Sequence, residues 1–277
     1  MTEKQQDQDQ TLLLGRQVPV VEQYCPQLLQ AIPRSLGREA MDIKGKLPFF
    51  GEDVWHAYEL SWLEPGGRPR VAVGRFCIPA DSPNLVESKS LKLYLHSFNN
   101  TEYQSINTLS RSIAQDMSAV VGAQVGVRLM DSQHPSLNGE SAEGVCVDQQ
   151  HYHASDSGPD AKLLICYEGQ PIEETLHSHL LRSLCPVTGQ PDWATVVVKY
   201  HGKPIDRASL LRYIVAYRQH QEFHEQCVER MFIDIAWACE PKRLEVQAFY
   251  TRRGGLDICP WRSSHQGRAA ILRLNRQ

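Results

Sequence analysis

The sequence has 277 residues, of which 42% are hydrophobic and 22% charged, with a formal net charge of −3 and a pI near 6.4. No run approaches the roughly 20 apolar residues that a membrane helix needs, and no broad basic field favours nucleic acid as a direct partner. The length exceeds the roughly 100–200 residues usual for one domain, so we expect two domains.

The chain begins with MTEKQQDQDQ, a polar stretch without the apolar core or cleavage site of a secretory signal. We therefore expect a frayed tail and a cytoplasmic protein. Eight cysteines are scattered along the chain with no CxxC pair, which argues against zinc knuckles and thioredoxin-like chemistry. In a reducing cytosol, most of them are expected to be small apolar fillers.

One series of elements occurs first between residues 69 and 130. PRVAVGRFCI is rich in β-branched and aromatic residues and predicts a strand. The next segment, NLVESKSLKLYLHSF, predicts a helix, because its large side chains recur on one helical face: Leu91, Tyr94, Leu95 and Phe98. A second helix carries Leu109, Ile113 and Met117, and VGVRLM then predicts another strand.

The same series returns in the second half of the chain. WATVVVKY and LEVQAFY predict strands, and two helical faces lie between them: Leu210, Tyr213, Ile214 and Tyr217, then Val228, Met231, Phe232 and Ile235. Glu87 aligns with Asp206 at a spacing of 119 residues, and a one-residue insertion then places Tyr103 on Phe223. Such a repeat indicates two copies of one fold.

The grouping of strands and helices predicts the fold class and the domain boundary. Strands that come in groups favour an α+β fold, with antiparallel sheets and helices on one face. Turn-forming residues are concentrated from Asp131 to Asp160. We therefore expect an N-terminal module at residues 1–140 and a C-terminal module at residues 141–277.

The two copies differ at polar positions. Glu87, Ser88 and Lys89 stand where the second copy has residues 206–208, and Phe223–Glu225 stand where the first copy has residues 103–105. Because each copy keeps polar groups that the other lacks, we expect one shared site and not two equivalent ones. The alternative stays open that a glutamate at a helix start only offsets the helix dipole.

A third polar cluster lies in CPVTGQPD, where Cys185 and Asp192 flank a loop that precedes a strand. Reactive groups often lie on loops held by rigid strands. A thiolate at Cys185 could act as a nucleophile, and Asp192 could donate a proton if burial raised its pKa. Spacing alone equally allows a buried cysteine before a turn and an aspartate that caps it.

The strings ESKSLKLYLHSFNN, CPVTGQPD and FHE, together with PRSLGRE, LPFFGEDVW and RRGG, resemble the NADPH-dependent 7-cyano-7-deazaguanine reductases of the queuosine pathway, in their long two-module form. The resemblance implies tandem tunnelling-fold (T-fold) modules, with the signature helix in the first and the cysteine in the second. It also implies an oxidoreductase that turns a nitrile into 7-aminomethyl-7-deazaguanine for tRNA modification.

The resemblance also assigns chemical roles to individual residues. Cys185 is expected to add to the nitrile carbon and give a covalent thioimidate, while Asp192 protonates the nitrogen. Two NADPH are needed because a nitrile lies four electrons above an amine. His224 is expected to supply a proton in the second reduction, since imidazole titrates near neutrality.

Binding roles follow from the same resemblance. Glu87 and Glu225 are expected to accept hydrogen bonds from the base, with Phe223 and His224 beside it, and Val86 and Ser88 at the edge of the pocket.

The dinucleotide needs a different kind of site. No GxGxxG follows a strand, so a Rossmann site is not supported. The phosphates of NADPH are expected to bind Ser88, Lys89, Arg253 and Gly254, because these offer a hydroxyl, cations and backbone N–H groups. Without the resemblance, RRGG indicates only a solvated turn.

Two histidine pairs raise the question of a metal: His151 with His153, and His177 with His179. In a strand the members of each pair would share a face. No cysteine or glutamate accompanies them at ligand spacing, and the resembled chemistry needs no metal, so we expect none.

Two other functions stay open on the residues. One is a hydrolase of the same fold that uses Cys185 without NADPH, and the other is a binding module for a pterin or purine. We expect a homodimer, because T-fold modules generally close their sheets by pairing.

Overall fold

A computed structural model describes residue 21, residues 23–153 and residues 158–277. The polar tail predicted at the start of the chain lies outside the described residues, and so does a part of the predicted linker, at residues 154–157. No helix in the described part is long and apolar enough to cross a membrane.

The chain forms two compact units, which are described here one at a time. Unit 1 comprises Met1–Leu36, Trp55–Leu137 and Arg252–Asp257. Unit 2 comprises Gly37–Val54, Asn138–Thr251 and Ile258–Gln277. The linear boundary between residues 140 and 141 stays a prediction.

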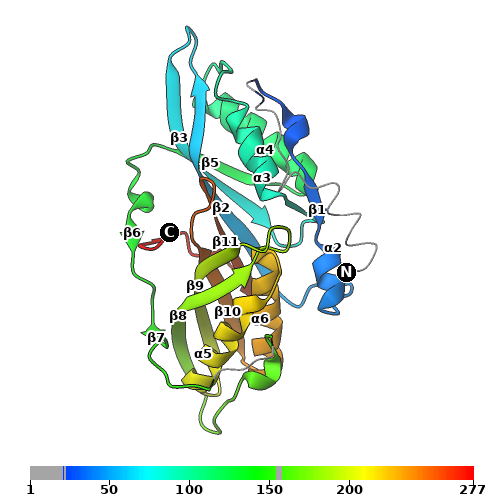
Figure 1. Cartoon of the computed structure of the whole chain (residues 1–277), viewed down its shortest axis with the longest axis vertical. Coiled ribbons are helices and arrows are strands. Elements are labelled where there is room, and N and C mark those ends of the chain that lie inside the picture. The colour runs from blue at the N-terminus through cyan, green and yellow to red at the C-terminus, as the bar shows by residue number, and fades with distance from the viewer. Residues whose placement is uncertain (1–20, 22, 154–157) are drawn as a thin grey trace. The chain divides into compact units, whose positions relative to one another are not determined.

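Unit 1 is built from a β-hairpin, two helices and a returning strand (Figure 1). The hairpin joins β2 (Phe50–Leu63), whose residues up to Val54 belong to unit 2, to β3 (Pro69–Pro79), and α3 (Ser88–His96) and α4 (Ile106–Val121) follow. Strand β5 (Gly126–Met130) pairs antiparallel with β3, so that Phe76 lies opposite Val127. A short pair, β1 (Ala31–Pro33) with β4 (Asn84–Val86), leads into α3.

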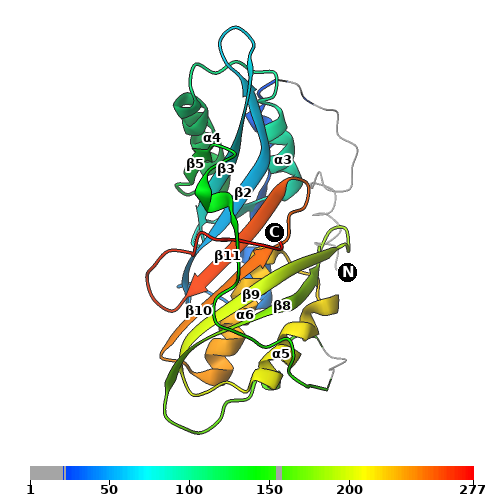
Figure 2. The same cartoon turned by 90° about the vertical axis from the view of Figure 1, so that its left-hand side faces the viewer.

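Unit 2 repeats this order and adds a further strand (Figure 2). Strand β8 (Ile172–Leu184) pairs with β9 (Pro191–Gly202), and α5 (Arg207–Val215) and α6 (His224–Cys239) follow. Strands β10 (Arg243–Tyr250) and β11 (Leu256–Ser263) complete the order β11–β10–β9–β8, all antiparallel. The short β7 (Val145–Cys146) adds in parallel at the outer edge of β8.

Short elements complete the two units. Strand β6 (Gly139–Glu140) pairs in parallel with β12 (Arg273–Leu274). Helix α2 (Ser35–Ala40) lies near the start of the described chain, and the remaining turns are 3₁₀ helices at Pro26–Leu28, Pro135–Leu137, Ala161–Leu163 and Ala216–Gln219.

Burial explains why the predicted helices form where they do. The apolar face of α4 is fully buried and comprises Leu109, Ile113, Met117 and Val121. In α3 and α5 the predicted large side chains are buried as well, while Phe98 and Tyr217 lie just beyond the helix ends. The α+β prediction is confirmed, since helices α5 and α6 cover one face of the strands of unit 2 (Figures 1 and 2).

The repeat is confirmed in its first helix, down to individual hydrogen bonds. Glu87 and Asp206 are the N-caps of α3 and α5. The hydroxyls of Ser90 and Ser209 each accept from a backbone N–H of the preceding segment, at 3.0 Å in both units.

The alignment predicted for the second helix is wrong by two residues. Ser105 is the N-cap of α4 and Phe223 the N-cap of α6, a spacing of 118 residues and not 120. Two equivalent tyrosine–aspartate hydrogen bonds agree with this register. Tyr94 donates to Asp116 and Tyr213 to Asp234, both at 2.6 Å, and the two aspartates are also 118 residues apart (234 − 116). The loop between α5 and α6 is therefore one residue shorter than the loop between α3 and α4. Tyr103 and Phe223 share an aromatic ring but do not occupy equivalent positions.

Candidate active site

Cys185 directly follows β8 and opens a tight loop that ends where β9 begins. Its backbone N–H donates to the Gln190 carbonyl, and the N–H of Gly189 donates to the Cys185 carbonyl, both at 2.9 Å. Gly189 has a φ of +67°, a conformation that side chains with a Cβ rarely adopt. The loop thus fixes a cysteine that is only 3% exposed.

The end of β8 also fixes the segment that precedes α6. The N–H of Leu184 donates to the His220 carbonyl at 2.8 Å, and Leu184 forms a bridge with Gln221. These contacts bind residues 220–221 beside the cysteine loop. The sequence FHE, far away along the chain, therefore begins its helix at the same end of β8.

Asp192 and His224 form a buried pair within unit 2. Asp192 lies near the start of β9, and its Oδ2 is 3.2 Å from Nε2 of His224, with side chains 6% and 15% exposed. The imidazole stacks on the Tyr250 ring, with 3.8 Å between centroids and 22° between planes. Carboxylate and aromatic ring together fix the orientation of a group that can carry a proton.

The other two residues of FHE open helix α6. Phe223 is the N-cap, and its backbone N–H donates to Oε1 of Gln226 at 3.2 Å, which leaves its half-buried ring uninvolved in capping. Glu225 lies in the first turn and is 4% exposed. A carboxylate there is favoured by the helix dipole, so its position has a structural as well as a functional explanation.

Glu87 in unit 1 caps helix α3 with both carboxylate oxygens. Oε1 accepts from the N–H of Lys89 at 2.9 Å, and Oε2 accepts from that of Ser90 at 2.6 Å. The capping role that the sequence left open is therefore present. A carboxylate can accept about four hydrogen bonds, so capping leaves capacity for a ligand. Val86 and Glu87 are buried, while Ser88 and Lys89 are half-buried.

RRGG forms the turn that the residues alone predict. Arg253 and Leu256 exchange backbone hydrogen bonds of 2.8 and 3.2 Å, and Gly254 and Gly255 between them have φ values of +62° and +80°. Two consecutive positive φ values are typical of a type I′ hairpin turn. Glycine suits position 255, because residues with a Cβ rarely adopt its φ of +80°.

Comparisons with known proteins identify the family of the chain. Residues 20–129 match a family described as nitrile reductase, 7-cyano-7-deazaguanine-reductase N-term, and residues 191–269 match one described as QueF-like protein. The NADPH-dependent 7-cyano-7-deazaguanine reductase of Bordetella parapertussis is 51% identical over 254 residues, which cover 91% of this chain and 93% of the relative. The chain belongs to this reductase family.

Other relatives show similar coverage. The protein of the same name from Dechloromonas aromatica is 52% identical over 91% of this chain and 89% of its own length. That of Bordetella avium is 49% identical over 95% and 97%. A crystal structure of the archaeosine synthase QueF-Like in the apo form is 16% identical, covers 36% of this chain and 100% of its own, and has a TM-score of 0.31.

The family's reductant carries phosphates, and the residues beside RRGG fit such a group. A Cβ built on Gly254 would lie 3.5 Å from Cδ and 3.7 Å from Nζ of Lys92, so the glycine leaves the backbone beside an ammonium uncovered. Lys92 belongs to α3, the helix that begins with Ser88 and Lys89. The carboxylate of Glu59, whose Oε2 lies 3.3 Å from Nζ of Lys92, would compete with a phosphate for this ammonium.

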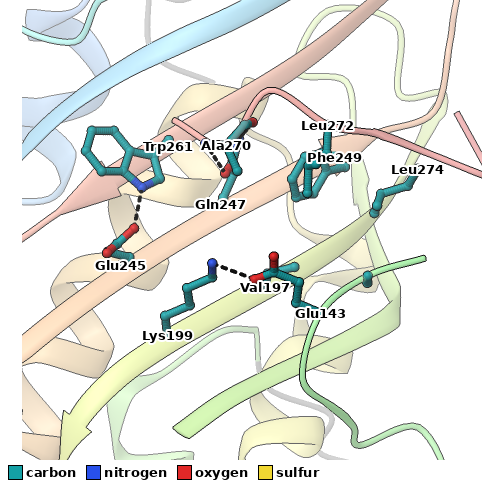
Figure 3. Close-up of a pocket in the computed structure, with 11 residues that line it drawn as sticks. Glu143, Val197, Lys199, Glu245, Gln247, Phe249, Trp261, Ala270, Leu272 and Leu274 are labelled. Atoms are coloured by element: carbon teal, nitrogen blue, oxygen red, sulfur yellow. Dashed lines mark hydrogen bonds and ion pairs between the residues drawn. The ribbon is translucent and has the colours of Figure 1, made fainter. Parts of the chain in front are cut away.

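The structure adds residues that sequence patterns did not single out. Lys92 and Tyr250 lie in a helix and a strand whose periodicity explains them fully, so no functional signal distinguishes them. Conversely, the pocket in Figure 3 contains none of the predicted site residues. It lies within unit 2 and is lined by Ala142, Glu143, Val197, Lys199, Glu245, Gln247, Phe249, Trp261, Ala270, Leu272 and Leu274.

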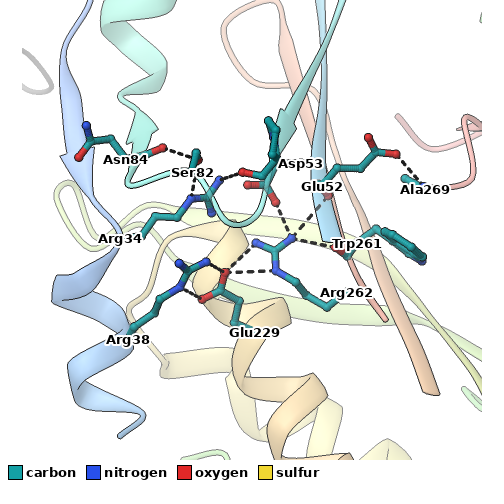
Figure 4. A network of polar contacts seen from close by, with 11 residues as sticks. Arg34, Arg38, Glu52, Asp53, Ser82, Asn84, Glu229, Trp261, Arg262 and Ala269 are labelled. Atoms are coloured by element: carbon teal, nitrogen blue, oxygen red, sulfur yellow. Dashed lines mark hydrogen bonds and ion pairs between the residues drawn. The ribbon is translucent and has the colours of Figure 1, made fainter. Parts of the chain in front are cut away.

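Helix α6 is anchored by a buried ionic network within unit 2 (Figure 4). Glu229 accepts from Arg38 and from Arg262, each at 2.8 Å, and Arg262 also donates to Asp53 at 2.7 Å. Burial alone would lower the pKa of Arg262, but Asp53 and Glu229 raise it above the usual value. The guanidinium therefore stays charged and ties the helix of His224 to β11 and to the start of β2.

Proposed function

We propose that the chain reduces the nitrile of 7-cyano-7-deazaguanine to the primary amine of 7-aminomethyl-7-deazaguanine and consumes two NADPH per product. The main support is the similarity to reductases named for this reaction, about half identical over nine-tenths of the chain. The cysteine loop and the Asp192–His224 pair supply the nucleophile and the proton carriers that such a reaction needs.

Cys185 is the nucleophile of the proposed reaction. Its sulfur bonds to the nitrile carbon, the triple bond becomes a C=N double bond, and a covalent thioimidate results. When bound, NADPH supplies the two hydrides that separate a nitrile from an amine. After the first reduction the C–S bond breaks, Cys185 leaves as thiolate, and an imine remains to be reduced.

Asp192 and His224 are the proposed proton carriers. The thiol proton of Cys185 reaches the nitrile nitrogen through Asp192, so thioimidate formation takes up no net proton. The amine nitrogen and the departing thiolate then each take up one proton, the former from His224. The 3.2 Å contact between carboxylate and imidazole supports a transfer between the two groups.

Recognition of the base is assigned to Glu87 and Glu225, whose carboxylates accept N–H groups of the deazaguanine ring. Both are almost fully buried, which strengthens such bonds. The ring of Phe223 stacks on the base, His224 lies beside it, and Val86 and Ser88 bound the edge. Ser88, Lys89, Arg253 and Gly254, joined here by Lys92, hold the phosphates of NADPH.

The hydrolase alternative is not supported, because the relatives are named as NADPH-dependent reductases. The reductase requires a cytoplasmic supply of NADPH, so we propose a cytoplasmic enzyme. We also propose a homodimer, on the ground that T-fold modules generally complete their sheets by pairing. The small molecule is the partner, and the net charge of −3 gives no support for direct nucleic-acid binding.

The decisive experiment combines intact mass, NADPH absorbance and product analysis. Purified protein is mixed with 7-cyano-7-deazaguanine, first alone and then with NADPH. We expect a covalent adduct without NADPH, and two NADPH oxidised per amine with it. Cys185→Ala should lose both adduct and turnover, whereas Cys25→Ser, a control in unit 1, should keep both.

Three outcomes would contradict the proposal. An adduct that yields amide or acid without NADPH oxidation would indicate the hydrolase. Binding of the base with neither adduct nor turnover would indicate a binding module. Full turnover in Cys185→Ala would remove the thioimidate from the reaction. Light scattering on the same sample tests the dimer, and a monomer at assay concentration would exclude it.

A further inference from the structure

A cluster of metal-binding side chains lies on the edge strands of unit 2, away from the cysteine loop. Strand β7 pairs in parallel with β8, and this register places Cys146 opposite His177. His179 follows two residues along β8. One ligand atom from each of Cys146, His177 and His179 lies within 4.8 Å of the other two. Strand pairing thus supplies the cysteine that sequence spacing did not reveal beside the histidine pair.

Both imidazoles are oriented by hydrogen bonds through the same ring nitrogen. Nδ1 of His177 is 2.8 Å from the Glu143 carbonyl, which can only accept, so Nδ1 carries the hydrogen and Nε2 keeps a lone pair. Nδ1 of His179 is 2.8 Å from Oγ1 of Thr195. An oxygen on the second ring nitrogen is typical of metal-binding histidines, because it fixes both tautomer and ring direction.

Asp148 completes the surroundings of the cluster. Its carboxylate accepts from the Ser178 hydroxyl at 2.7 Å and from the N–H of His179 at 3.2 Å. The charge of Asp148 also acts on the nearby Cys146 thiol. Exposure decreases from Cys146, which is exposed, through His179 to the buried His177. An ion can therefore enter from solvent beside Cys146 and reach the two histidines, whose rings are held by hydrogen bonds to the protein.

We propose that Cys146, His177 and His179 form a Zn²⁺ site. Two imidazoles and a thiolate suit zinc, and three protein ligands leave one tetrahedral position for water or Asp148. Bond lengths of about 2.0 Å to nitrogen and 2.3 Å to sulfur put tetrahedral ligand atoms about 3.3–3.5 Å apart. The ligand atoms, which lie within 4.8 Å of one another, must therefore move closer together, and the exposed Cys146 side chain has the most freedom to do so.

The ion replaces the thiol proton, which passes to solvent, so the bound cluster carries one thiolate. Its effect is to link β7 to β8 and thereby fix the chain segment that contributes Glu143 to the pocket of Figure 3. The site is independent of the proposed reduction, which uses no metal.

The test uses the full chain, stripped of metal and kept reduced, and titrated with Zn²⁺ against a chromophoric chelator. We expect one Zn²⁺ per chain. Cys146→Ser, His177→Gln and His179→Gln should each weaken binding at least about tenfold, since even the loss of a group that only hydrogen-bonds to a metal ligand costs about that much. Cys25→Ser and His153→Gln are matched controls outside the cluster and should bind like the parent. Co²⁺ should give a tetrahedral spectrum with thiolate charge transfer, absent in Cys146→Ser.

The proposal would be overturned by binding below one equivalent, or by cluster variants that bind as tightly as the controls. It would equally be overturned if only Cys146→Ser weakened binding, which would indicate a lone surface thiol. Cys185→Ala must keep the Zn²⁺, because its loss would place the metal at the nucleophile. Circular dichroism of each variant separates lost ligands from lost folding, and Zn²⁺ should raise the Tm of the parent but not of Cys146→Ser.

Discussion

His224 is held on two sides, by the carboxylate of Asp192 and by the ring of Tyr250. The two contacts serve different ends. Stacking fixes the plane of the imidazole, whereas the carboxylate fixes which ring nitrogen faces it. Because Asp192 and His224 touch one another, a change to either side chain alters the surroundings of the other.

This contact predicts non-additive losses of activity. Asp192→Asn and His224→Ala should each lower kcat by roughly 10²–10⁴, the range of general acid–base catalysis. The double variant should lose little more than the worse single variant, because the pair acts as a unit. Steady-state kinetics on the three variants measures this, with Tyr250→Phe as a control that keeps the stacked ring. Multiplicative losses would show that the groups act independently.

The contacts of Glu222, which directly precedes FHE, should make the free energy of unfolding depend on pH. Burial raises its pKa, but His220 and Arg230 lower it more, and the result lies below the usual 4.5. The folded protein therefore binds fewer protons than the unfolded chain, so this stabilisation is complete above about pH 4.5 and is lost as the pH falls through the folded pKa. In urea unfolding, Glu222→Gln should be less stable than the parent near pH 7, and the gap should narrow in acid. A gap that is constant with pH would contradict the assignment.

At the scale of elements, helix starts carry both stability and function. Glu87 caps α3 and Asp206 caps α5 through equivalent backbone contacts. The repeat thus offers a comparison inside one chain, between a cap assigned to substrate binding and a cap that is not. The two caps differ in that Glu87 uses both carboxylate oxygens, whereas Oδ2 of Asp206 accepts from the Tyr167 hydroxyl, and only Glu87 is proposed to meet a ligand.

Replacing each cap by its amide separates the two roles. Glu87→Gln and Asp206→Asn should both lower the free energy of unfolding by less than the about 0.5–2 kcal/mol of a lost cap, because an amide oxygen can still accept from the backbone N–H groups. Only Glu87→Gln should also raise the KM for 7-cyano-7-deazaguanine, because it removes an acceptor for the base. Denaturant unfolding and kinetics on the same preparations test this. If both variants kept the parent KM, Glu87 would be a cap alone.

On the scale of the whole molecule, one supersecondary unit has been used twice and specialised differently. Unit 1 keeps Glu87 and the cations of α3, while unit 2 keeps Cys185 and the Asp192–His224 pair. Specialisation extends to the interior, where unit 2 buries Arg262 with two carboxylates. A buried ionic network is costly when incomplete, because an unpaired charge cannot be solvated.

Glu229→Gln should therefore be the most destabilising of these substitutions. It leaves Arg38 and Arg262 with less compensating charge, and breaking a buried pair costs about 3–5 kcal/mol. Denaturant unfolding measures the loss. Glu168→Gln, in an exposed pair with Lys203, is the control and should not change stability measurably. A loss for Glu229→Gln no larger than that of the control would mean that the network does not anchor α6.

The sequence by itself determined the helices, several strands and the existence of a repeat, because periodicity and composition are local properties. It did not reveal β2 and β8, whose strands FGEDVWHAYELSWL and IEETLHSHLLRSL carry polar residues that are buried only through partners elsewhere in the chain. Nor did the sequence predict how the second helices of the two copies align. The aromatic rings of Tyr103 and Phe223 suggested one alignment, whereas the N-caps Ser105 and Phe223 show another.

For the site, residue types and family strings indicated Cys185, Asp192 and His224, but only the tertiary structure decided what each of them contacts. The Asp192–His224 pair, the ring of Tyr250 and the position of Lys92 beside Gly254 arise from strand pairing and helix packing. The same holds for Cys146 beside His177 and His179, where a parallel strand closes a gap of about thirty residues. Local sequence fixes which groups are present, whereas non-local packing fixes their neighbours, and chemistry depends on both.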